Sequence, residues 1–401
     1  MLNLARARHA VLVSVFAFLG ACTALSQSPP PASPPDIPGT WYFAVSGDSR
    51  DCGDLIMPKI AQAIAADTAS PARFYWHLGD FRRLYGPDCD VVKRDPRYTN
   101  WDCGKRPEGD LAADTMSQYL AMAWDDFIER QIHPFAPTPV FLGIGNHELA
   151  AGRTSDDFRR KFQPWLTSAP IHLQRVKEAS DHFYSTEGDT YYHFVMDGVD
   201  FIYLDNADDG KSFSAAQLNW LETVLKRDET ASPPVRTIVV GMHEALPFSK
   251  QRIHAMDATC QGLCSGQRVY DLLYRAQKLD DRGVPGRRVY VFASHSHTFV
   301  EDAFAQQAEH AGQVLPGWIV GTAGAEQYRT AKEPIEYGYV LGAIHPDGTL
   351  VVKFHAVTRD SPPVATDPGA GPLTDFCFTG NRVDPGNSAY TKSCACGEAK
   401  P

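Results

Sequence analysis

The chain has 401 residues, of which 43% are hydrophobic and 21% charged, a composition that is ordinary for a globular protein with a sizeable core. We expect one large domain with a small appendage at most. The formal net charge of −10 argues against a surface that binds nucleic acid without regard to its sequence.

The N-terminal segment is predicted to direct export. Arg6 and Arg8 precede an apolar run too short to span a bilayer, which predicts a secretory signal over residues 1–21. The run ends in Leu-Gly-Ala-Cys, which resembles a bacterial lipobox with Cys22 as the lipidated first residue of the mature chain; an ordinary signal cleavage site is the alternative. Residues 22–38 have the Pro and Ser content of an extended tether. We therefore expect an exported lipoprotein of the bacterial cell envelope, held by its lipid at the outer membrane and facing the periplasm or the cell surface.

The cysteines suit an oxidising setting. Eight of the nine follow Cys22, and an even number in an exported chain favours disulfide bonds, whose pairing the sequence leaves open. Cys260 and Cys264, with His254 nearby, could instead hold zinc. In an exported chain we favour disulfides for this pair as well.

From residue 40 short apolar strands alternate with helical stretches, and this alternation predicts a layered α/β fold. In the first half we predict, in chain order, a strand at 41–46, a helix at 55–66, a strand at 74–78, a helix at 116–131 and a strand-like run that begins at Val140. Residues 85–112 break this rhythm with Pro and Cys, and we expect them to form an insertion on the cleft side. The folded domain is placed at 39–360, with a cysteine-bearing tail at 361–401.

The second half is predicted to be richer in strands. Alternating residues at 191–196 and 199–204 flank Asp197-Gly198, which predicts a β-hairpin, and an amphipathic helix is expected at 215–227. The further predicted strands are 183–185, 235–240, 288–292, 318–320, 339–344 and 350–355, the last two joined by a turn at Asp347-Gly348.

Five of the predicted strands end in side chains that can bind metals. The residues concerned are Asp48, Asp80, Asn146 with His147, His243, and His295 with His297. In open α/β sheets ligands bind at the carboxyl ends of strands. Carboxylate and amide oxygens mixed with imidazole nitrogens suit iron, zinc or manganese. Any one of these residues alone is more often a turn residue or a structural histidine, but five such endings in one chain predict a shared metal site.

These strand ends resemble, in order and spacing, the signature of the calcineurin-like metallophosphoesterase superfamily over roughly residues 40–357. The matching blocks are Gly47-Asp48, Gly79-Asp80, Gly145-Asn146-His147-Glu148, Val240-Gly241-Met242-His243 and His295-Ser296-His297. The spelling of the fourth block, with His182–Ser185 and Phe201–Asp205, is most similar to the purple acid phosphatase branch. The resemblance implies a four-layer αββα sandwich, in which helices flank two mixed β-sheets and the metal site lies at the carboxyl ends of strands.

By this resemblance the chain is a metallophosphoesterase with two metal ions, which could be iron, zinc or manganese. The reaction implied is hydrolysis of a small phosphomonoester or phosphodiester by a metal-activated hydroxide. His147 would lie beside the scissile bond, where it could protonate the leaving oxygen or stabilise the transition state. The implied ligands are Asp80 as the bridge, Asp48 and His297 for the first ion, and Asn146, His243 and His295 for the second.

Two departures from the family pattern concern the first ion. Many members have a histidine where this chain has Arg50, and the purple acid phosphatases have a metal-binding tyrosine where this chain has Arg83. The first ion would then have one protein ligand fewer, with water or Tyr85 filling in. Arg50, Arg82 or Arg83 could bind a substrate phosphate, for which a guanidinium is well shaped, although each could also be an ordinary surface arginine.

A second class of function stays open because of Arg50. The chain could be a non-catalytic, surface-anchored binder of phosphate or carbohydrate that kept the fold and lost the first metal. Other enzyme chemistries are disfavoured, since the sequence contains neither a Gly-x-Ser-x-Gly elbow nor a Walker-type phosphate loop.

Overall fold

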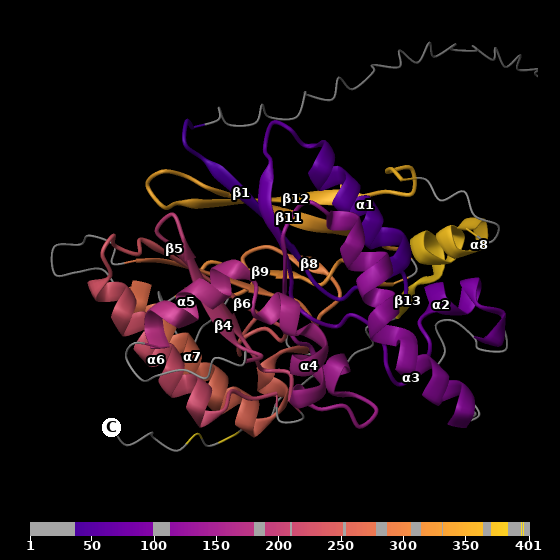
Figure 1. Ribbon diagram of the computed structural model, residues 1–401, viewed down its shortest axis with the longest axis horizontal. Coiled ribbons are helices and arrows are strands. Elements are labelled where there is room, and N and C mark those ends of the chain that lie inside the picture. The colour runs from indigo at the N-terminus through magenta and orange to yellow at the C-terminus, as the bar shows by residue number, and fades with distance from the viewer. Residues whose placement is uncertain are drawn as a thin grey trace, which may run out of the picture. The chain divides into compact units, whose positions relative to one another are not determined.

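The structure is a computed structural model, and Figure 1 shows its elements. It describes residues 37–98, 113–179, 189–208, 211–251, 254–277, 287–305, 314–330, 332–363, 370–383, 394 and 396. The chain divides between Asp36 and Ile37, and every described element belongs to the second unit, Ile37–Pro401. The predicted signal, the lipid site at Cys22 and the predicted strand 183–185 lie outside the described residues.

The first sheet has five strands in the order β12-β11-β1-β2-β3. The central strand β1 (Trp41–Ser46) pairs in parallel with β2 (Ala72–His77), and β2 pairs in parallel with β3 (Val140–Leu142). On its other side β1 pairs antiparallel with β11 (Tyr337–Ile344), which forms a hairpin with β12 (Leu350–Val357). The carboxyl ends of β1, β2 and β3 therefore lie at one edge of this sheet.

The second sheet has six strands in the order β4-β5-β6-β7-β9-β8. Its four inner strands are parallel: β5 (Val199–Leu204), β6 (Thr237–Met242), β7 (Arg288–Ala293) and β9 (Gly317–Val320). The outer strands β4 (Tyr192–Met196) and β8 (Phe299–Val300) run antiparallel to their neighbours. The turn between β4 and β5 has positive φ at both Asp197 (50°) and Gly198 (78°), the backbone that a two-residue hairpin needs.

Helices cover the outer faces of both sheets, while the inner faces pack on each other. The helices are α1 (Gly53–Ala66), α2 (Cys89–Arg94), α3 (Ala113–Phe127), α4 (Ser155–Leu166), α5 (Ala169–Ala179), α6 (Ala215–Thr230), α7 (Cys260–Gln277) and α8 (Ala370–Asp375). Buried leucines and valines of α6 and α7, which run side by side in Figure 1, form one core with β5, β6 and β7. A short parallel pair, β10 (Gln327–Tyr328) and β13 (Arg382–Val383), stands apart from the two sheets.

Aromatic rings join the two sheets. Phe201 of β5 lies 5.1 Å from both Phe43 of β1 and Phe74 of β2, measured between ring centroids, and all three rings are buried. Edge contacts of this kind add about 0.5–1.5 kcal/mol per pair to the burial of the ring area. Two mixed sheets packed face to face and flanked by helices confirm the predicted α/β sandwich.

Most predicted strands are confirmed, and the main omissions are helices. Helices α4, α5 and α7 were not expected, because Pro164 and Pro170, and the glycines and cysteines at the start of α7, weaken the helical pattern. Residues 85–98, the described part of the predicted insertion, also contain a helix that was not expected. They form α2 and a short turn, and Val91, Val92 and Tyr98 are buried in the core.

Three disulfides tie the C-terminal tail to the domain. They are Cys52–Cys377, Cys260–Cys394 and Cys264–Cys396. The disulfide prediction for Cys260 and Cys264 is confirmed, so neither thiol is available for zinc. Disulfides are typical of extracellular and exported proteins. Within the described part of the chain, no helix is both long enough and apolar enough to cross a bilayer.

Candidate metal centre

The strand-end residues predicted from the sequence meet at one place. Asp48 follows β1, Asp80 follows β2, Asn146 and His147 follow β3, His243 follows β6, and His295 and His297 follow β7. All of these side chains are buried except Asn146, which is partly exposed. Because the two sheets bring the carboxyl ends of their parallel strands to this point, residues almost 250 positions apart in the chain become neighbours.

The backbone bends sharply to aim these side chains. Asp48, Asp80, His295 and His297 all have positive φ, at 61°, 61°, 60° and 45°. This conformation is uncommon for residues other than glycine and costs free energy, so its repetition in one site points to a functional constraint. A hydrogen bond links two of the bends, since the backbone N–H of His295 donates to Asp48 Oδ2 at 2.7 Å.

The ligands expected for the second ion present their donor atoms to one another. Nε2 of His243 lies 3.0 Å from Asn146 Oδ1, 3.0 Å from His295 Nδ1 and 3.3 Å from Asp80 Oδ1. Nδ1 of His243 lies 2.9 Å from the carbonyl oxygen of Leu78 and donates to it, which leaves the lone pair of Nε2 facing the other three groups. With Asp48, the residues Asp80, His243 and His295 form a buried group whose ligand atoms lie within 4.8 Å of one another.

These residues fit a metal cation. Asp48 Oδ1 and Asp80 Oδ2 are buried oxygens without a hydrogen-bond donor among the described residues, an arrangement that is costly unless a cation is bound. Nε2 of His243 and Nδ1 of His295 lie 3.0 Å apart, so either a shared proton or a cation must lie between these two nitrogens. Burial opposes protonation of His243, but the carboxylates of Asp80, Asp48 and Glu244 together outweigh it and raise the pKa of His243 to about 10 in the protein alone. A metal ion would take the place of that proton.

Arg50 lies where the ligands of the first ion were expected. Its Nη1 and Nη2 are each 2.8 Å from a histidine Nε2, that of His147 and that of His297, and its Nε is 4.0 Å from Asp80 Oδ2. The side chain is only 4% exposed. The two remaining ligands expected for this ion, Asp48 Oδ1 and His297 Nε2, are 3.4 Å apart.

The other two arginines considered for phosphate binding have protein partners. Arg83 Nη2 lies 2.8 Å from Asp51 Oδ1 and 3.2 Å from Glu326 Oε2. Arg82 is fully buried and its guanidinium is surrounded by the carboxylates of Asp54, Asp88, Asp90 and Asp126, at 2.5 to 3.7 Å. Arg82 is therefore a structural residue, whereas substrate binding by Arg50 and Arg83 stays a prediction.

His147 has a fixed orientation. Its Nδ1 lies 2.6 Å from the carbonyl oxygen of Arg83 and donates to it, so the Nε2 lone pair accepts the hydrogen bond from Arg50. Burial, and then the guanidinium of Arg50, lower the pKa of His147 to about 4. In this arrangement the ring is neutral at pH 7 and carries no proton on Nε2, so its role as a proton donor stays a prediction.

Four charged residues of the site were missed by the sequence analysis. Glu148 was quoted only as part of a motif, and it accepts hydrogen bonds from the backbone N–H groups of Asp80, Phe81 and Gly145, each at 2.8 Å. Lys211 and Glu244 form an ion pair at 2.9 Å, and Lys211 Nζ lies 3.4 Å from His295 Nε2. Glu326 lies beside Arg50 and Arg83. Glu148 and Glu244 directly follow the motif histidines His147 and His243, which was a usable signal; Lys211 and Glu326 carry no motif.

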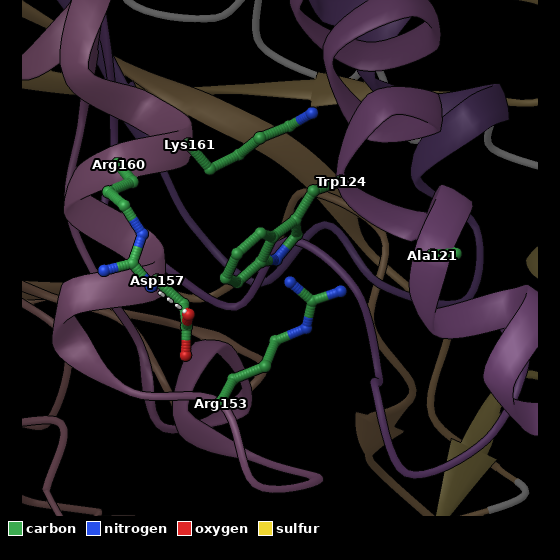
Figure 2. A pocket seen from close by; sticks show the side chains of 6 residues that line it. All are labelled: Ala121, Trp124, Arg153, Asp157, Arg160 and Lys161. Atoms are coloured by element: carbon green, nitrogen blue, oxygen red, sulfur yellow. Dashed lines mark hydrogen bonds and ion pairs between the residues drawn. The ribbon is translucent and has the colours of Figure 1, made fainter.

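A surface cavity of about 390 Å³ lies away from this centre, between α3 and α4 (Figure 2). Its lining residues are Ala121, Trp124, Arg153, Asp157, Arg160 and Lys161. The guanidinium of Arg153 stacks on Trp124 at 3.6 Å, and Arg160 is paired with Asp157. None of the strand-end residues lines this cavity.

Comparisons with known proteins give distant likenesses among solved structures. No protein-family model and no curated protein matches the sequence. Among solved structures, a purple acid phosphatase from yellow lupin (Lupinus luteus) seeds matches with 13% identity and a TM-score of 0.46. The match covers 79% of this chain and 51% of the lupin chain. This chain thus spans about half the length of the lupin protein.

Two further solved structures are similar at the same level. GAP50, the anchor in the inner membrane complex of Plasmodium, has 11% identity and a TM-score of 0.44, and the match covers 88% of this chain and 99% of GAP50. A Staphylococcus aureus protein named as a 5′-nucleotidase has 13% identity and a TM-score of 0.43, with 84% and 58% of the two chains covered. Likeness at this level does not identify the family of the chain.

Proposed function

We propose that this chain is a metal-dependent hydrolase of phosphoesters. The observation that carries the proposal is the convergence of Asp80, Asn146, His243 and His295, whose oxygen and nitrogen donors face one another at the carboxyl ends of strands. This is the mixed ligand set that the metallophosphoesterase resemblance implies for its second ion, and it suits zinc, iron or manganese better than calcium or magnesium.

The positive charges beside these ligands also support the proposal. Although the chain is acidic overall, Arg50 and Lys211 place two cationic groups next to the ligand histidines. A guanidinium and an ammonium can both neutralise the oxygens of a phosphate group. A metal ion bound at this centre would act as a Lewis acid towards a phosphoryl oxygen and would lower the pKa of a bound water.

His147 would position the reacting phosphate. Its ring is held by the Arg83 carbonyl and lies 3.7 Å from Asp80 Oδ2, so it borders both the ligand set and Arg50. To act as a general acid, His147 would have to exchange its Arg50 hydrogen bond for one with the leaving group and take up a proton on Nε2. We infer positioning as the role that fits the geometry without this rearrangement.

We further propose, from the sequence, that the protein acts outside the cytoplasm on a small phosphorylated substrate. The three disulfides support export. The anchor at Cys22 rests on the sequence, and recovery of a Cys22→Ser variant still attached to lipid would contradict it.

The function is tested by assaying the purified chain with a phosphomonoester and a phosphodiester. Nitrophenyl phosphate and bis(nitrophenyl) phosphate serve as substrates, with manganese, zinc or iron supplied to chelator-treated protein. We expect metal-dependent hydrolysis that is reduced at least a hundredfold in His243→Asn. His133→Asn is the matched control, since His133 is exposed and lies outside the centre. Its activity should equal that of the wild type.

A chain that binds metal at this centre and hydrolyses neither substrate, nor other phosphoesters tried after them, would contradict the proposal. That outcome would favour the second candidate, a non-catalytic binder of phosphate or carbohydrate. The position of Arg50 among the first-ion ligands is the observation that keeps this candidate in view.

A further inference from the structure

Arg50 lies against the ring nitrogen that His297 would offer to a first metal ion. The Nδ1 of His297 donates to the carbonyl oxygen of Glu326 at 2.7 Å, so only Nε2 of this ring has a lone pair to offer a metal. That lone pair faces Arg50 Nη2 at 2.8 Å and accepts its hydrogen bond. The same guanidinium donates through Nη1 to His147, so the lone pairs of two imidazoles converge on Arg50.

Glu326 and Tyr85 also hold the Arg50 guanidinium. Glu326 Oε1 lies 3.5 Å from Arg50 Nη2, and the hydroxyl of Tyr85 accepts from Nη1 at 3.2 Å. Glu326 is itself held at 3.2 Å by Arg83, whose guanidinium also pairs with the buried Asp51 at 2.8 Å. This row of alternating charges fixes the Arg50 side chain in a buried position, and a buried arginine is not discharged by deprotonation.

The other half of the centre contrasts with this arrangement. Between Asp80, Asn146, His243 and His295 the described residues place no guanidinium or ammonium group, and the nitrogen and oxygen atoms face one another directly. The nearest ammonium, that of Lys211, approaches His295 at Nε2, whereas the Nδ1 atom faces His243. One half of the centre is therefore open to a cation and the other half is filled by one.

We propose that the Arg50 guanidinium replaces the first metal ion, so that the chain binds a single ion, held by Asp80, Asn146, His243 and His295. The inference rests on the proposed metal-dependent function. It replaces the two bound ions that the family resemblance implies by one. Arg50 then supplies the second positive charge at the centre. A guanidinium offers planar N–H donors to the oxygens of a phosphate, whereas a metal ion would act there as a point charge.

The ion count per chain tests this proposal without any measurement of activity. Protein loaded with manganese, passed through a desalting column and analysed by inductively coupled plasma mass spectrometry should contain one ion per chain. In Arg50→His, which removes the guanidinium and adds a nitrogen ligand, the count should rise to two. Electron paramagnetic resonance should show isolated manganese in the wild type and a spin-coupled pair in this variant.

Two further variants sharpen the test. In the wild-type background His297→Asn should leave the count at one, because His297 is not a ligand there, but in the Arg50→His background it should return the count from two to one. Tyr85→Phe is the matched control: it removes a hydrogen bond to Arg50, keeps the guanidinium and should stay at one. Circular dichroism and thermal unfolding establish that each variant is folded.

Two ions per wild-type chain would overturn the proposal, and so would a folded Arg50→His variant that stays at one. The proposed function can fail separately, since a chain with one tightly bound ion and no phosphoester hydrolysis would refute the enzyme and leave the ion count intact.

Discussion

Glu148 illustrates how one side chain can hold the centre without touching a ligand atom. Its two carboxylate oxygens accept from three backbone N–H groups, two of which belong to Asp80 and Gly145. The hydrogen bond from the backbone N–H of Asp80 fixes the strained backbone of that residue, whose φ is 61°. Positive φ at a buried carboxylate persists only where the surroundings impose it, and Glu148 is part of what imposes it.

Replacing Glu148 by glutamine should therefore loosen Asp80. The amide keeps the size of the side chain, but its nitrogen cannot accept a hydrogen bond, so at least one backbone N–H group loses its partner. We expect the free energy of unfolding to fall by about 1–3 kcal/mol and metal affinity to fall with it. Denaturant unfolding and metal titration measure the two effects. Glu129→Gln, at an exposed position, should change neither, and unchanged metal affinity in Glu148→Gln would refute the positioning role.

His193 belongs to a buried cluster of opposite charges away from the metal centre. Its Nε2 lies 2.6 Å from Glu178 and its Nδ1 lies 2.8 Å from Asp200. Arg227 also faces Glu178 at 3.6 Å, and Asp228 interacts with Asp200. Burial opposes protonation of His193, but Asp200 and Glu178 together raise its pKa to about 10.

This cluster should make stability depend on pH in the alkaline range. Because the folded-state pKa is above the ordinary value of histidine, the stabilisation is complete below about pH 6.5 and is lost as the pH rises towards 10. In His193→Gln we expect a deficit on the order of 3 kcal/mol at about pH 6 that becomes smaller at about pH 9.5. Chemical unfolding of both proteins at the two pH values measures it. A deficit of the same size at both would show that the charge of His193 is not the cause.

Among the elements, the strands were more predictable than the helices. The strands 41–46 and 199–204 have the predicted bounds, because β-branched and aromatic residues there are bounded by clear turn signals. Helix α7 was missed because Gly262 and Gly266 interrupt it. The structure shows why glycine is needed there: a Cβ at Gly266 would collide with the ring of Pro247, and one at Gly262 with the backbone of Met256. Close packing against α7, which a single sequence does not display, decides those positions.

The end of β3 has a glycine requirement that bears on the site. A Cβ at Gly145 would meet the carboxylate and backbone nitrogen of Asp80, and would lie 2.9 Å from a ring carbon of His243. Gly145→Ala should therefore displace two of the proposed ligands and cost about 1–3 kcal/mol of stability. We expect bound metal to be lost, as measured by elemental analysis. Gly371→Ala is the control because its Cβ would meet no atom within 4 Å. Wild-type metal content in Gly145→Ala would contradict the site geometry.

At the scale of the whole molecule, the tail is an integral part of the fold. The disulfide Cys52–Cys377 joins residues 325 positions apart, from the start of α1 to the segment that follows α8. The amide of Asn381 adds a hydrogen bond to the carbonyl of Gly324 at 3.0 Å. The predicted boundary at residue 360 separates parts of the sequence that differ in composition, but the disulfides join those parts into one structure.

Removing the Cys52–Cys377 disulfide should destabilise the folded chain. In the double variant Cys52→Ser/Cys377→Ser we expect the free energy of unfolding to fall by about 2–5 kcal/mol. Denaturant unfolding under non-reducing conditions measures the change, with the wild type in reducing agent as a comparison. A double variant as stable as the oxidised wild type would show that the tail contributes little to the domain.

The sequence predicted which residues form the centre better than how they are arranged. The order of the strand-end motifs was sufficient to place Asp80 and Asn146 together, because parallel strands of a sheet share one carboxyl edge. His243 follows a strand of the second sheet, and only the family resemblance predicted that it joins them. The order of the motifs was not sufficient to place Arg50 between His147 and His297, since that position depends on Glu326, which lies 276 residues further along the chain and has no motif. Disulfide pairing was unpredictable for the same reason, because it depends on contacts between distant segments.

The most direct test of the account is to measure phosphoester hydrolysis while metal is titrated into metal-free protein, with bound metal counted in the same samples. We predict no hydrolysis before metal is added, a rate that rises in proportion to bound metal and levels off when the centre is full, and loss of both binding and hydrolysis in folded Asn146→Ala. Asn219→Ala, on the surface of α6, should behave as the wild type. Full hydrolysis by the metal-free chain, or a filled centre with no hydrolysis of any phosphoester, would contradict the account.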